Sequence, residues 1–246
     1  MTVSIVVICE GPVDQWTGCG LADRVICKHA EWITDEVIGH YRCWRGLTPG
    51  AEFCLWKHVG DLARERGIRA YGHFADQPAE PDALAARRAL LLIASLDEAP
   101  DAVVLLRDDD GQDERRKGLE QARNERRRMN IPIVVGLARA KRECWVLAGF
   151  EPRDGDEQRK LADLRQELGF DPTLQGERLD ARTPNAKKNA VRVLERLIGR
   201  NPDREAACWL TTDLAILAQR GSQSGLATYL KEVEQSIVPL FVRAVQ

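Results

Sequence analysis

The chain has 246 residues, of which 44% are hydrophobic and 30% charged, a composition that excludes large-scale disorder and suits a globular protein. Its 36 basic and 38 acidic residues give a formal net charge of −2, so a uniformly basic protein is excluded, although a local basic face would still permit a nucleic-acid partner. No apolar run approaches the roughly 18 residues of a membrane span and no leader peptide is recognised, so we expect a cytoplasmic protein without a membrane partner.

The first element is a strand over residues 3–9, where a β-branched run with almost no polar residue indicates burial on both faces. Glu10-Gly11-Pro12 ends it. The next stretch is less regular. Helical spacing of apolar residues predicts helices over residues 30–42 and 53–66, and we interpret residues 15–66 as a helical insertion.

Strands and helices then alternate as far as residue 150. The expected strands cover residues 67–74, 102–106 and 131–137, and the expected helices cover 81–96, 112–129 and 143–149. Alternation of this kind implies parallel pairing with right-handed crossovers. We therefore predict an α/β domain over residues 1–150, with a mostly parallel sheet flanked by helices.

Beyond residue 150 only helical patterns are recognised. The expected helices cover residues 186–197, 204–219 and 225–240. The prediction for residues 151–246 is a helical C-terminal extension, and nothing in the sequence indicates the oligomeric state.

Carboxylates follow two of the buried strands directly. Glu10 follows the first strand, and Asp108 and Asp110 follow the strand at 102–106. Because active groups of such sheets gather at the carboxyl ends of the strands, we expect these three side chains to lie together. If the strand continues through the triplet, Asp108 and Asp110 point to one side and Asp109 to the other.

Two interpretations of this acidic triplet stay open from the residues alone. Adjacent carboxylates repel one another, and a hard cation such as Mg²⁺ or Mn²⁺ relieves that repulsion. Alternatively, Asp-Asp-Gly forms a solvated turn that caps the following helix.

Three short motifs in this order resemble the TOPRIM domain, and most closely the TOPRIM-like proteins of the DUF4276 group. The motifs are Cys9-Glu10-Gly11-Pro12-Val13-Asp14, Leu106-Arg107-Asp108-Asp109-Asp110-Gly111 and Arg142-Glu143-Cys144-Trp145-Val146-Leu147-Ala148. The resemblance covers residues 3–150, with a departure in the long stretch between residues 14 and 67.

The resemblance implies that Glu10 is a metal ligand or general base, and that Asp108 and Asp110 hold one or two Mg²⁺ ions, which Mn²⁺ can replace. It also implies that Glu143 is a further ligand or a structural anchor. Related nucleases often carry an acidic residue at the place of Asp14.

Asp109 is a further acidic candidate. The reaction implied by this chemistry is metal-dependent hydrolysis of phosphodiester bonds in DNA or RNA. By the same resemblance, the setting is prokaryotic phage defence or genome maintenance, with an ATPase as a partner.

Several cations are candidates for phosphate contacts. Lys141 and Arg142 adjoin Glu143, and Lys187 and Lys188 open the helix expected at 186–197. The charged helix at 112–129 is either a phosphate-binding surface or a solvated, salt-bridged face. Its basic residues are Arg115, Arg116, Lys117, Arg123, Arg126, Arg127 and Arg128.

Seven cysteines with irregular spacing are typical of reduced thiols, although a zinc site drawn from the cysteines and histidines of residues 19–58 is an alternative. Two other functions also stay open. One is a non-catalytic TOPRIM-like module that binds a nucleotide or acts with a partner protein such as an ATPase. The other is a phosphotransfer or phosphatase enzyme, which would need a compact closed pocket for a small substrate.

Overall fold

The computed structural model describes residues 2–74, 77–126 and 129–242. The chain divides into two compact units. Unit 1 comprises Met1–Arg107, Gln112–Gly136 and Glu232–Gln246, and unit 2 comprises Asp108–Gly111 and Leu137–Lys231. These boundaries differ from the expected division at residue 150, because each unit is built from separate stretches of the chain.

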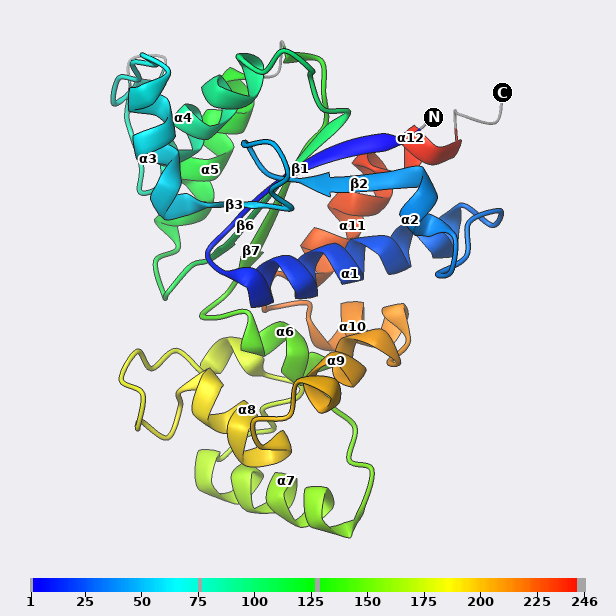
Figure 1. Ribbon diagram of the computed structural model, residues 1–246. Helices are drawn as coiled ribbons and strands as arrows, with labels where there is room; N and C mark the ends of the chain where they lie inside the picture. The colour runs from blue at the N-terminus through cyan, green and yellow to red at the C-terminus, as the bar shows by residue number, and fades with distance from the viewer. Residues whose placement is uncertain (1, 75–76, 127–128, 243–246) are drawn as a thin grey trace. The chain divides into compact units, whose positions relative to one another are not determined.

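The sheet is the framework of unit 1. It has five strands in the order β2-β1-β6-β7, and β3 also pairs with β1. The strands are β1 (Val3–Cys9), β2 (Arg42–Arg45), β3 (Cys54–Leu55), β6 (Ala102–Asp108) and β7 (Ile133–Ala138), of which β6 and β7 end in unit 2. β1 runs parallel to β2, β3 and β6 (Figure 1). The expected α/β architecture with a mostly parallel sheet is therefore confirmed.

Helices of unit 1 flank this sheet. They are α1 (Pro12–His29), α2 (Ile38–Tyr41), α3 (Trp56–Glu65), α4 (Ala83–Ala94), α5 (Glu114–Glu125) and α12 (Val238–Val242). α4 packs against both α3 and α5 (Figure 1). α1 contacts β1 and α12. A glycine at position 118 permits the close approach of α5, because an added Cβ there would overlap the carbonyl oxygen of Pro81.

Two expectations for unit 1 are wrong. Residues 30–42 are not one helix: they include only the short α2, and the chain enters β2 at Arg42. Pairing with β1 overrides the helical spacing here, and Asp23 of α1 fixes the new strand by accepting hydrogen bonds from Arg42 and Trp44. Residues 67–74 contribute only β4 (His73–Phe74), which pairs with β5 (Gln77–Pro78) outside the main sheet.

Unit 2 is helical, as expected for the C-terminal region. Its elements are α6 (Glu143–Ala148), α7 (Gly155–Leu168), η2 (Gly176–Arg178), α8 (Ala190–Ile198), α9 (Pro202–Leu210), α10 (Leu214–Arg220) and the first part of α11 (Leu226–Ser236). The helix expected at 204–219 is two helices. Asp213 caps α10 at its first turn, and Thr212 donates a hydrogen bond to the carbonyl of Gly149. The chain therefore turns between α9 and α10.

Unit 2 contains a buried ion pair. The guanidinium of Arg204 donates to both carboxylate oxygens of Glu157, at 2.7 and 2.9 Å, and to the carbonyl of Glu151 at 2.8 Å. It also lies over the ring of Phe150, 4.8 Å from the ring centre. The hydrogen bonds from Arg204 lower the pKa of Glu157. Because both side chains are buried, neither can lose its partner without leaving a charge out of water.

Among the residues that the structure describes, none of the helices has the length and apolar character needed to cross a membrane.

Candidate functional site

The strand that carries the acidic triplet ends earlier than the motif suggests. β6 finishes at Asp108, and Asp110 and Gly111 both adopt left-handed backbone conformations, with φ of 49° and 70°. Strand alternation therefore does not orient Asp108 and Asp110, which corrects that part of the sequence argument. Aspartate is one of the few residues with a side chain that tolerates this conformation, at a cost of about 1 kcal/mol.

Asp109 holds this turn in place. Its buried carboxylate accepts hydrogen bonds from the backbone amides of Gly111 at 2.8 Å and Ala140 at 2.7 Å. Its own amide donates to the carbonyl of Ala138 at 2.9 Å. These hydrogen bonds tie the turn 108–111 to the segment that follows β7, so the observed role of Asp109 is structural.

Unit 2 brings Asp108 and Asp110 together with the segment that leads into α6. Oδ1 of the buried Asp108 accepts the amide of Arg142 at 2.8 Å. Oδ1 of Asp110 lies 3.6 Å from Nζ of Lys141. The carbonyl of Asp110 accepts hydrogen bonds from Nε and Nη2 of Arg182, at 2.9 and 2.6 Å. The turn is thus held at its carboxylates and at its backbone.

Arg142 and Glu143 form an internal ion-pair network. The guanidinium of Arg142 is buried and lies 3.0 Å from Glu143 and 2.5 Å from Glu205. This arrangement favours the anchor role for Glu143 and a positioning role for Arg142. Lys141 keeps 30% of its side chain exposed, so it is the better placed of the two neighbouring cations to meet a phosphate.

Glu10 lies in unit 1, at the end of β1. Its carboxylate is 33% exposed and lies 3.3 Å from Nη1 of Arg107. Asp82 in turn holds Arg107 in place, because its carboxylate accepts a hydrogen bond from Nε of Arg107 at 2.8 Å. The nearest acidic residue along the chain is Asp14, in the first turn of α1.

Asp14 lies close enough to Cys9 to influence its thiol. Burial, and then the charge of Asp14, raise the pKa of Cys9 to about 12. Glu10 and Asp14 both belong to unit 1, whereas Asp108 and Asp110 belong to unit 2. A metal ion shared by Glu10 and the two aspartates stays a prediction.

The donor chemistry of the aspartates suits a hard cation. Mg²⁺ often binds through one or two carboxylates, and water and substrate phosphates complete its shell. Asp108 and Asp110 supply two such carboxylates within one turn. Within residues 2–74, 77–126 and 129–242, no group of three or more His, Cys, Asp or Glu side chains is arranged to hold a metal ion.

Two of the cysteines considered as zinc ligands have raised thiol pKa values when no metal is bound. Burial raises the pKa of Cys27 to about 12 and that of Cys54 to about 11, so both thiols stay protonated at neutral pH. Zinc binds the thiolate form. No zinc site is found among the residues that the structure describes, so the structure gives no support to the zinc alternative.

The charged helix is mostly a salt-bridged face. In α5, Arg115 pairs with Asp82, and Arg123 pairs with Glu232 at 2.8 Å and with Glu120 at 3.9 Å. Such internal partners favour the solvated-face interpretation over a phosphate surface. Arg127 and Arg128 lie outside the described residues.

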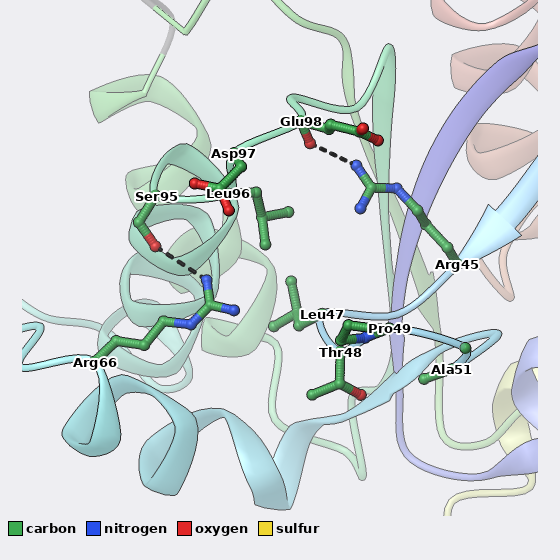
Figure 2. A pocket seen from close by; sticks show the side chains of 11 residues that line it. Arg45, Leu47, Thr48, Pro49, Ala51, Arg66, Ser95, Leu96, Asp97 and Glu98 are labelled. Carbon is green, nitrogen blue, oxygen red and sulfur yellow. Dashed lines mark hydrogen bonds between the residues drawn. The ribbon is translucent and has the colours of Figure 1, made fainter.

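Unit 1 also contains a pocket of about 750 Å³ between the β2–β3 connection and the ends of α3 and α4. Figure 2 shows Arg45 donating to the carbonyl of Glu98 and Arg66 donating to the hydroxyl of Ser95 on two sides of it. Leu47 and Leu96 add apolar walls. None of the carboxylates predicted from the motifs lines this pocket, so it gives no support to a small-substrate phosphatase.

Sequence reasoning missed Arg182 and the partners of the predicted residues. Arg107 stands directly before Asp108, but the motif argument considers only the acidic residues there. Arg182 lies 72 positions from Asp110. A charge count along the chain would have indicated it, since it opens the most basic stretch of unit 2.

A scan of protein-family models, a search of curated proteins and a search of solved structures each found no match to this chain. The residues themselves and the three short motifs are therefore the basis on which a function can be proposed.

Proposed function

We propose that this chain is a TOPRIM-like nuclease that depends on Mg²⁺ or Mn²⁺ and hydrolyses phosphodiester bonds of DNA or RNA. The observation that supports this most directly is the turn 108–111. It presents two carboxylates, Asp108 and Asp110, directly after a buried strand and beside the cation of Lys141. Glu10 follows β1, which is the parallel neighbour of that strand.

Each residue has a distinct part in this proposal. When bound, the divalent ion would withdraw charge from the phosphate that is attacked. Asp108 and Asp110 would hold it, and Asp109 keeps their turn fixed through Gly111 and Ala140. Lys141 would contact a non-bridging phosphate oxygen. Glu10 would serve as a further ligand or take the proton from the attacking water, and Arg107 orients its carboxylate.

The test is cleavage of labelled single- and double-stranded DNA and RNA with Mg²⁺ or Mn²⁺. We expect Asp108→Asn and Glu10→Gln each to lower the rate by about 100-fold or more, since each removes several kcal/mol of charge stabilisation. EDTA should abolish cleavage. Mn²⁺ binding, followed by electron paramagnetic resonance, should weaken in Asp108→Asn.

Asp61→Asn is the matched control. Asp61 is an exposed carboxylate of α3 that pairs at the surface with Arg64, so its removal should leave both readouts unchanged. Cleavage that persists in EDTA, or that is equal in Asp108→Asn, Glu10→Gln and wild type, would remove the basis of the proposal.

One observation favours the alternative of a non-catalytic module that acts with a partner such as an ATPase. Glu10 and Asp110 already lie beside cations of the chain itself, Arg107 and Lys141, which can take the place of a metal ion. This alternative requires that saturating Mn²⁺ leaves the spectrum of free Mn²⁺ unchanged. The nuclease proposal requires the opposite, and the setting in phage defence or genome maintenance belongs to the proposal in either form.

A further inference from the structure

Residues 181–200 are unusually basic for this chain. They contain six Lys and Arg residues and a single carboxylate, Glu195, in a protein whose formal net charge is −2. The cations are Arg182, Lys187, Lys188, Arg192, Arg196 and Arg200. All of them lie in unit 2, on the loop 181–189 and on α8 with the residues that follow it. We call this set the basic surface.

The loop part of the basic surface is held at its base. Asp180 and Asn189 form an isolated antiparallel bridge, and the amide of Ala181 donates to the carbonyl of Lys188 at 3.2 Å. The buried Asn189 donates to the carbonyl of Ala181 and accepts from the amide of Arg192, so it closes the loop and caps α8. A closed loop of this kind presents its exposed side chains in a restricted arrangement.

The positive charge of the basic surface is only partly neutralised. Lys187 and Lys188 are exposed, and neither forms an ion pair with a residue in the described part of the chain. Arg192 and Arg196 share one carboxylate, that of Glu167 on α7. The hydrogen bond from Arg196 lowers the pKa of Glu167, and the charges of Arg192 and Lys187 lower it further, so several cations surround this single acid.

The basic surface is joined to the acidic turn within the same unit. Arg182, its first cation, donates two hydrogen bonds to the carbonyl of Asp110. Arg182 therefore links the acidic turn directly to the loop that also carries Lys187 and Lys188. An anion that reached Asp110 through a divalent ion would meet these cations next, whereas a chain without regularly spaced negative charges would gain little from them.

We propose that the basic surface binds the phosphate backbone of a nucleic acid and leads it to the turn 108–111. This inference rests on the proposed nuclease function and names the element that holds its substrate. Lys187 and Lys188 contact phosphates that flank the reacting one. Arg182 is a positioning residue, because it fixes the backbone of Asp110 and reaches the substrate only through it.

The test is binding of fluorescent single- and double-stranded oligonucleotides in EDTA, where cleavage cannot interfere. We expect the double variant Lys187→Ala/Lys188→Ala to lower affinity by at least about 10-fold at low salt. The slope of log affinity against log salt should fall by about 1 for each phosphate that the protein no longer neutralises, hence by about 2 for the pair.

The matched control is Arg159→Ala/Lys160→Ala on α7. It removes the same charge from the same unit, at exposed residues whose partner is Asp156. An equal decrease of affinity in both double variants would overturn the inference, because it would show an effect of net charge alone. Equal binding by wild type and Lys187→Ala/Lys188→Ala at every salt concentration would also overturn it.

The outcomes separate this inference from the proposed function. If wild type cleaves nucleic acid and Lys187→Ala/Lys188→Ala cleaves it equally well, the inference about the basic surface is overturned and the nuclease proposal is kept. If wild type binds oligonucleotides in a salt-dependent way, loses this binding in Lys187→Ala/Lys188→Ala and shows no cleavage in Mn²⁺, the basic surface is supported as a binding site and the nuclease proposal is overturned. Competition by poly-glutamate as strong as that by DNA would overturn the inference in favour of an acidic protein partner.

Discussion

The two units differ in the elements that build their cores, and this difference decides which of their features can be found in the sequence. Unit 1 has a sheet whose central strands are apolar, with Ile5, Val104 and their neighbours fully buried. Unit 2 has short helices around an apolar core, with Phe150 and Trp209 among its buried side chains, and this core also contains a buried guanidinium, that of Arg204. An apolar strand can be recognised from a few consecutive residues of the sequence, whereas an ion pair between residues 47 positions apart cannot.

The largest effect is expected from the centre of unit 2. Glu157→Ala leaves the Arg204 guanidinium buried without its main partner, so we expect it to lower the free energy of unfolding by about 3–5 kcal/mol. Hydrogen exchange measured by mass spectrometry should show faster exchange in unit 2. Asp156→Ala, which removes an exposed carboxylate of the same helix, should leave the free energy of unfolding almost unchanged. Equal effects of the two variants would contradict a central role for the buried pair.

The same ion pair makes stability depend on pH. The folded-state pKa of Glu157 is below its ordinary value, so the folded state binds fewer protons than the unfolded chain at acidic pH. Its contribution is present above the ordinary value of 4.5 and is lost as pH falls through the lowered folded-state value. Urea unfolding of wild type between neutral and acidic pH should show this loss. Glu157→Gln, which cannot ionise, should show a shallower decline.

Unit 1 should lose stability when its packing is disturbed. Gly118→Ala forces a methyl group into the backbone of Pro81, so we expect a loss of about 1–3 kcal/mol. Gly60→Ala is the matched control, since a Cβ on Gly60 of α3 meets no other atom. It should be neutral or stabilising by up to about 1 kcal/mol. Thermal unfolding measures both, and the comparison fails if Gly118→Ala is as well tolerated as Gly60→Ala.

The smallest expected change in stability belongs to the acidic turn. Asp110→Gly relieves the left-handed conformation but frees the unfolded backbone, so the net change should stay within about 1 kcal/mol. It nevertheless removes a proposed metal ligand. We therefore expect cleavage to be lost while the melting temperature hardly moves. Retained cleavage in a stable Asp110→Gly variant would exclude this carboxylate from the site.

Much of unit 1 could be predicted because its signals are local. The apolar runs of β1 and β6 need no partner to be recognised, and the carboxylates at their ends are identified by position. The prediction for the region after α1 is wrong because this segment pairs with β1, and because the side chains of Arg42 and Trp44 donate to Asp23, which no spacing pattern reveals.

The candidate site was predictable only in part, for the same reason. The motif around Asp108 predicts candidate metal ligands, but it does not predict that Asp109 accepts a hydrogen bond from the amide of Ala140. It also could not reveal that Arg182 reaches the backbone of Asp110 from a distant loop. Interactions of this kind depend on how separate stretches of unit 2 fold together.

Residues 232–242 belong to unit 1 although they follow all of unit 2 in the sequence. Glu232 accepts the amide of Val135 in β7 at 3.0 Å and pairs with Arg123, and Phe241 of α12 is buried. During synthesis, every residue of unit 2 therefore leaves the ribosome before unit 1 can be finished. Until then the amide of Val135, on the edge strand β7, has no carboxylate acceptor.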